Sequence, residues 1–236
     1  MRCALTVAAA VLCAGVAGAQ APDKELVATL SGPPLRGGIV SGVAWAGGTV
    51  IIQTVALEAD GTRAAHYFVV PGPRMQLREM KDAPAGVERY WQVKASRVSP
   101  TGLGKITTDA DAKMPMYGIA SQEKRLLEAN EMGGTRVTHE LRIGALLLHR
   151  RFNAAPYDGE VWSWSPPELN RIAYVDEKGD LYIALADGRN PERVLKGNYT
   201  LPAWSDDGLA LAVAERKGNG TKWEVSVIHL PEKYRR

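Results

Sequence analysis

Residues 164–185 read WSPPELNRIAYVDEKGDLYIAL, and residues 204–228 read WSDDGLALAVAERKGNGTKWEVSVI. Each stretch begins with Trp-Ser and continues with an apolar strand, a turn that contains Gly and Lys, and a second strand. The two leading tryptophans, Trp164 and Trp204, lie 40 residues apart. A period near 40 residues that contains several short strands is typical of β-propeller blades.

Three weaker copies extend the repeat towards the N-terminus. One begins at Trp45 and leads into the β-branched run at residues 50–57. Another occupies residues 119–127, where Ala120 stands in place of the tryptophan. Trp45 and Ala120 are separated by almost two periods, so a further copy should begin near the degenerate segment 82–86. The sequence therefore predicts an all-β protein, a β-propeller of about five blades with one of them degenerate.

Closure of the predicted ring has two alternatives. The apolar stretch at residues 25–30 can serve as the outer strand of the last blade. Otherwise the ring is incomplete or open and is completed by another chain, since proteins normally avoid exposed strand edges. No segment shows a convincing helical period, and residues 122–132 fit a hairpin better than a helix.

The repeat resembles the WD-like repeat of the TolB propeller family. Its best copy here combines WSP at 164–166, IAY at 172–174, KGD at 178–180, LYI at 181–183 and DG at 187–188. The resemblance implies blade geometry and protein–protein contact in the cell envelope. It covers the propeller alone, because the chain has no room for the α/β domain that precedes a six-bladed propeller in that family.

The Trp-Ser turns belong to the scaffold of such a repeat. In a blade the tryptophan packs between sheets, and the Ser and Asp side chains satisfy backbone groups of the turn. The residues assigned to this structural role are Trp45, Trp164, Ser165, Trp204, Ser205, Asp206, Asp207 and Gly208.

The first 19 residues have the layout of a secretory signal peptide. A positive start at Arg2 precedes the apolar run 4–16 and the small-residue site Ala17-Gly18-Ala19, so we expect cleavage after Ala19. The run is too short to span a membrane. The mature part, residues 20–236, is then a single propeller-like domain in the periplasm or outside the cell, with no stable membrane insertion.

The composition and motifs exclude several classes of activity. With 29 basic and 26 acidic residues, the net charge of +3 is too balanced to indicate binding to nucleic acid. Both cysteines, Cys3 and Cys13, lie in the predicted signal peptide, so the mature part has no disulfide or thiolate site. The pair His139-Glu140 lacks the second histidine of a zinc-protease helix, and no Gly-x-Ser-x-Gly is present. We expect no catalytic constellation, no cofactor and no metal.

One stretch has the composition of a binding site. Arg150, Arg151 and Phe152, with Tyr157 and Trp162 nearby, can hold an anionic or sugar ligand by charge and stacking. The leading hypothesis is a non-enzymatic module that binds another protein of the cell envelope. The alternative is a propeller that binds or cleaves carbohydrate in its central funnel with acids such as Asp176, Glu177 and Asp180. A third reading is the remnant of a larger propeller, which predicts a dimer.

Overall fold

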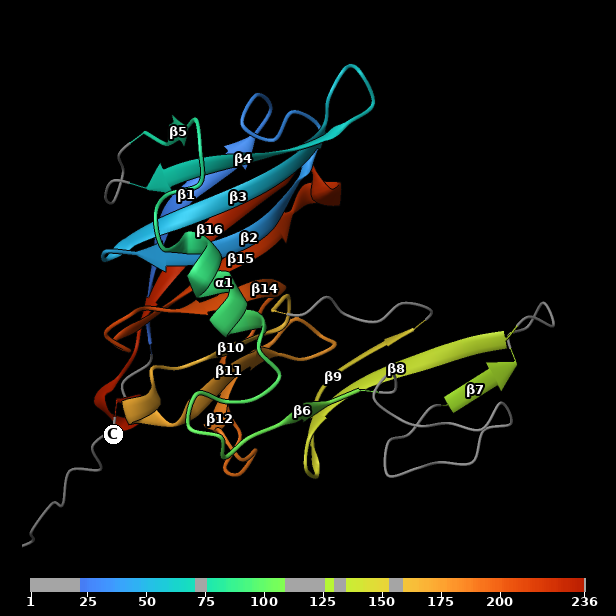
Figure 1. Cartoon of the computed structure of the whole chain (residues 1–236). Coiled ribbons are helices and arrows are strands. Elements are labelled where there is room, and N and C mark those ends of the chain that lie inside the picture. Colours follow the sequence, from blue (N-terminus) through green and yellow to red (C-terminus); the bar gives the residue numbers. More distant parts are fainter. Residues whose placement is uncertain (1–21, 71–75, 109–125, 130–134, 153–158, 236) are drawn as a thin grey trace, which may run out of the picture.

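The computed structural model describes residues 22–70, 76–108, 126–129, 135–152 and 159–235. The predicted signal peptide, residues 119–125 of the third repeat copy, and Tyr157 lie outside these ranges. In the described part the fold is all-β, with four sheets in a propeller-like ring and one α-helix (Figure 1).

Each of the first two sheets is built from consecutive stretches of the chain. Sheet I has the strand order β2 (Ile39–Ala46), β3 (Thr49–Leu57), β4 (Arg63–Val70) and β5 (Arg78–Met80). In sheet II the long strand β8 (Thr135–Ile143) pairs on one side with β9 (Leu146–Phe152). On its other side it pairs with β6 (Ile106–Thr107) and β7 (Leu126–Ala129).

The other two sheets contain the two strongest repeats. Sheet III has the order β10 (Trp162–Trp164), β11 (Arg171–Val175), β12 (Leu181–Leu185) and β13 (Glu192–Leu195). Sheet IV has the order β14 (Tyr199–Trp204), β15 (Ala210–Lys217), β16 (Lys222–His229) and β1 (Asp23–Ser31). Short 3-10 turns lie at Pro167–Leu169, Gly218–Gly220 and Glu232–Tyr234.

Strand β1 agrees with the first of the two alternatives for ring closure, in which residues 25–30 form the outer strand of the last sheet. It runs antiparallel to β16, from the pair Asp23–His229 to the pair Ser31–Lys222. The first strand of the described chain thus covers the edge of the last one, which would otherwise expose unpaired backbone groups.

The sheets pack through their inner strands. β14 of sheet IV packs against β2 of sheet I and against β10 of sheet III, and β9 of sheet II contacts β11. The indole of Trp45 donates a hydrogen bond across the first of these interfaces to the carbonyl oxygen of Ala203, at 3.0 Å. The repeat turns are closed locally, since the Ser165 and Ser205 hydroxyls accept from the backbone N–H groups of Arg171 and Ala210.

Helix α1 (Val87–Ala95) corrects the expectation that no segment is helical. It follows the segment 82–86, where the sequence placed the degenerate blade, and its N-cap is Gly86, whose φ of +86° suits glycine. A fifth sheet is not found among the described residues, so the prediction of five blades is not confirmed.

Candidate functional site

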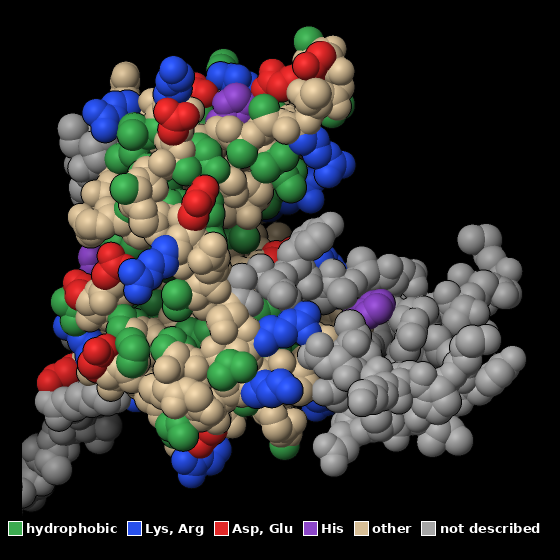
Figure 2. Space-filling view, viewed as in Figure 1, with side chains coloured by type: hydrophobic (Ala, Val, Ile, Leu, Met, Phe, Trp, Pro, Cys, Tyr) green, Lys and Arg blue, Asp and Glu red, His purple; other side chains and the backbone are tan. Residues whose placement is uncertain are grey.

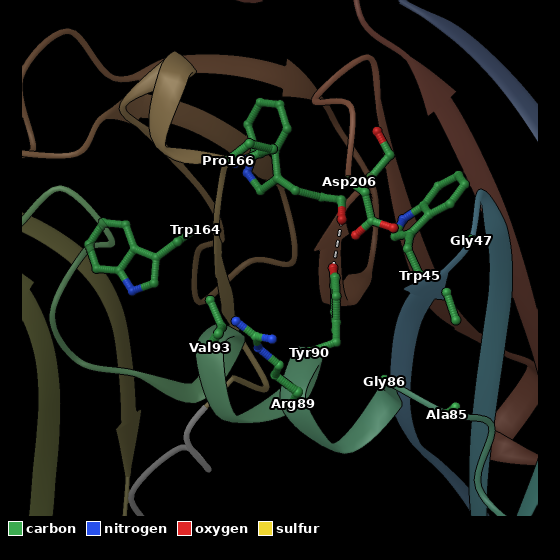
Figure 3. Close-up of a pocket in the computed structure, with 13 residues that line it drawn as sticks. Trp45, Gly47, Ala85, Gly86, Arg89, Tyr90, Val93, Trp164, Pro166 and Asp206 are labelled. Atoms are coloured by element: carbon green, nitrogen blue, oxygen red, sulfur yellow. Dashed lines mark hydrogen bonds between the residues drawn. The ribbon is translucent and has the colours of Figure 1, made fainter.

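Helix α1 lies between the inner strands of three sheets (Figures 1 and 3). It packs against β2 and β10. The Tyr90 hydroxyl donates to the carbonyl oxygen of Trp204 in β14 at 2.7 Å, and the Trp91 indole donates to the carbonyl oxygen of Val43 in β2 at 3.4 Å. The helix therefore lies against the inner strands of sheets I, III and IV.

A glycine in β2 allows this close approach. A Cβ atom built on Gly42 would lie 3.0 Å from the Trp91 ring and 3.2 Å from the Gln53 side-chain oxygen. Any larger residue would have to push the indole away. Gly42 thus fixes how closely α1 packs on sheet I.

A small aromatic cavity lies where β2, β10 and β14 end (Figure 3). Its volume is about 380 Å³, and the three repeat tryptophans Trp45, Trp164 and Trp204 all line it. Asp206 also lines it, and burial together with the neighbouring Asp207 raises the pKa of its carboxyl group. The tryptophans are at most 8% exposed, so they present little ring surface to a ligand.

A larger cavity of about 670 Å³ lies at the opposite ends of β2 and β14, and we call it the basic cavity. Helix α1 contributes Trp91 and Lys94 to its wall, and Trp223 adds a second indole. Its basic side chains are Arg63, Lys94, Arg151 and Arg216, and Glu160 is the acidic residue of the described lining. In Figure 1 the β3–β4 and β15–β16 hairpins end on the right of the upper part, and Figure 2 shows Lys and Arg side chains at that edge.

Lys94 is the most unusual group in the basic cavity. It is 4% exposed, and its Nζ donates to the carbonyl oxygen of Val43 at 3.5 Å. No carboxylate among the described residues pairs with it. Burial without a counter-charge disfavours the ammonium form and lowers the pKa of Lys94 to about 7.

The arginines of the basic cavity differ in their partners. Arg151 is held by Glu160 through two contacts, at 3.1 and 3.2 Å. Arg63 and Arg216 are exposed and form no ion pair with any residue that the structure describes. Two guanidinium groups and one buried amine are thus left without an anionic partner in the described lining.

The binding residues expected from the sequence do not form one cluster. Arg151 lines the basic cavity, but its neighbour Arg150 bonds to Glu140 on β8 through Nε and Nη2, at 3.0 and 2.8 Å. Trp162 is completely buried in the core between sheets II and III, so it cannot stack on a ligand. Tyr157 and the Phe152 side chain lie outside the described residues.

The repeat pattern does not mark Trp91 or Lys94, because both lie just beyond the degenerate copy. Their spacing of three residues, with Tyr90 beside Trp91, is the signal that could have shown them on a helix. Arg63, Arg216 and Trp223 sit at strand ends, where a charged or aromatic side chain is common.

The acids and histidines do not converge on either cavity. Asp176 accepts from the backbone N–H groups of Lys178 and Asp180 in the β11–β12 turn, and Asp180 pairs with Arg193. His66 lies between Glu58 and Glu79. Within the described ranges, no group of three or more His, Cys, Asp or Glu residues could hold a metal ion.

Comparisons place the chain in no established group. No family model, no curated protein and no solved structure matches it. The resemblance of its repeats to TolB propellers therefore stays a prediction from the sequence. No helix among the described residues is long and apolar enough to cross a membrane.

Proposed function

We propose that this chain is an exported, non-enzymatic β-propeller that binds another protein of the bacterial cell envelope. One observation carries the proposal: the basic cavity is lined by four basic side chains and two tryptophans, with a single acidic residue in the described lining. Arginine and tryptophan are the residues that most often dominate protein interfaces. A hydrolytic site would instead need acids or histidines converging on the cavity.

We take the repeat to have five positions, with helix α1 and its preceding loop in place of the second blade. Its support is the site of α1, which follows residues 82–86 and packs on the inner strands β2 and β10. The signal-peptide pattern supports export to the periplasm or the cell exterior, and the TolB-like repeat supports an envelope role.

The proposal is tested by capture of a partner. The tagged mature chain, residues 20–236, is incubated with envelope extract, and bound proteins are identified by mass spectrometry. We expect one envelope protein at reproducible stoichiometry, and the complex should form again from the two purified components. A folded sample that captures no such protein would overturn the protein-binding function.

Carbohydrate binding is the second candidate, and one observation favours it. Trp91 stacks on Tyr67, with ring centroids 6.1 Å apart, beside the basic cavity. Aromatic faces of this kind pack against sugar rings. Binding of the same sample to a polysaccharide array, together with an empty capture lane, would favour this alternative.

A further inference from the structure

The basic cavity has more positive charge than its described lining neutralises. Glu160 already accepts from both terminal nitrogens of Arg151. Lys94, Arg63 and Arg216 line the same cavity without a carboxylate partner among the described residues. Because a buried charge is costly unless it is paired and hydrogen-bonded, this arrangement is suited to an anion that arrives from outside.

A buried hydrogen-bond donor in the cavity wall points to the same ligand chemistry. The Lys94 ammonium has three donors, and the described residues offer it one acceptor, the carbonyl oxygen of Val43. Buried donors are normally satisfied, so an acceptor that enters the cavity would complete the hydrogen bonds of the Lys94 ammonium.

We propose that the basic cavity receives a carboxylate group from an acidic segment of the partner protein, with Lys94 as the buried cation and Arg63 and Arg216 at its edge. This inference rests on the proposed function, since it assumes a protein partner. Every Asp, Glu and C-terminus of a protein supplies the required group. A cavity of about 670 Å³ can admit such a side chain, and the faces of Trp91 and Trp223 can pack on its methylene groups.

Binding of the carboxylate should be coupled to uptake of a proton. Lys94 has a pKa of about 7 in the unbound protein, and a nearby carboxylate raises it. The other charged groups of the cavity are Arg63, Arg151, Arg216 and the paired Glu160. Strands β2 and β10 have no ionisable side chain, and Tyr199 of β14 accepts from Lys24. Lys94 is therefore the group expected to take up the proton near neutral pH.

The test is isothermal titration calorimetry of residues 20–236 with an acetylated, amidated hexaglutamate peptide. Two buffers of different ionisation enthalpy give the number of protons taken up. We expect the peptide to bind, and to bind more weakly at pH 8.5 than at pH 6. Binding should be accompanied by uptake of a fraction of a proton at pH 7, and this fraction should rise towards one proton at pH 8.5. Hexaglutamine should not bind.

Variants assign the effect to the cavity. Lys94→Met keeps an unbranched side chain one atom shorter and removes the charge, and it should weaken hexaglutamate binding about 30-fold or more and abolish proton uptake. Arg63→Gln and Arg216→Gln change exposed residues, so folding should be unaffected while affinity falls about two- to fivefold in each. Lys178→Met is the matched control, because Lys178 lies exposed in the β11–β12 turn and not in the cavity.

Several results would overturn the inference. They are equal binding of hexaglutamate and hexaglutamine, unchanged affinity in all three cavity variants, or binding of inorganic phosphate without binding of the peptide. Capture of the envelope partner separates the two proposals. If Lys94→Met and Arg63→Gln capture the partner as well as the wild type does, the carboxylate site is wrong and the protein-binding function stands.

Discussion

At the scale of single residues, the burial of Lys94 lowers the free energy of unfolding, and no carboxylate among the described residues pairs with its ammonium group. Its pKa falls from the ordinary 10.5 to about 7 on burial. Between these values the unfolded chain holds a proton that the folded chain has lost, so the free energy of unfolding rises with pH over this interval. The destabilisation is complete below pH 7 and disappears above pH 10.5.

Lys94→Met should therefore stabilise the protein at neutral pH. The apolar side chain avoids the desolvation cost, and the advantage over the wild type should shrink by roughly 2 kcal/mol between pH 7 and pH 9. Urea unfolding of both proteins at the two pH values measures this difference. An advantage that is the same at both pH values would show that Lys94 does not titrate in this range.

Gly42→Ala tests the contact between α1 and sheet I. The added methyl group would lie 3.0 Å from the Trp91 ring, so we expect a loss of about 1–3 kcal/mol in unfolding free energy. Trp91→Phe in the same chain should recover part of the loss, because the smaller ring leaves room for the methyl group. Strictly additive effects of the two substitutions, seen in thermal or urea unfolding, would contradict the contact.

Single residues differ in how far the sequence reveals them. Trp164 and Trp204 stand out because each repeats with a serine and a following strand. Lys94 stands in a segment without a repeat motif, and its burial depends on strands that are distant in the chain. Trp162 shows the opposite error: an aromatic residue near two arginines suggested a binding surface, but it faces the core.

At the scale of elements, the irregularity in β1 between Leu26 and Ala28 shifts the alternation of buried and exposed side chains. Leu30 is fully buried, whereas Leu26 on the same strand is 50% exposed. Leu30→Ala should cost about 2–5 kcal/mol, and its matched control Leu26→Ala should change stability by less than about 0.5 kcal/mol. Chemical unfolding of both variants checks this. Similar losses in the two would mean that Leu30 is not buried in the core as described.

Helix α1 shows why the sequence pattern failed for one element. The less exposed positions Val87, Tyr90, Trp91 and Lys94 follow the spacing of one helix face. Two neighbours obscure this pattern, because the charged Lys94 is buried while Val93 is 50% exposed. A helix of nine residues also depends on tertiary packing, so this spacing alone does not predict it.

At the scale of the whole molecule, the repeat period predicts the all-β class and the propeller-like arrangement of the sheets. The number of blades is harder to predict, because the segment 82–86, where a degenerate copy was expected, is followed by the helix Val87–Ala95 and not by a sheet. The basic cavity arises where β2, β9, β14 and α1 meet, and these elements are far apart in the sequence. No local motif could have placed its four basic residues together.

The most direct test of the account is capture from envelope extract with three forms of the mature chain in parallel: the wild type, Lys94→Met and Lys178→Met. The account predicts that the wild type and Lys178→Met retain the same envelope protein, and that Lys94→Met loses most of it while remaining folded. No partner for any of the three folded proteins would contradict the binding function.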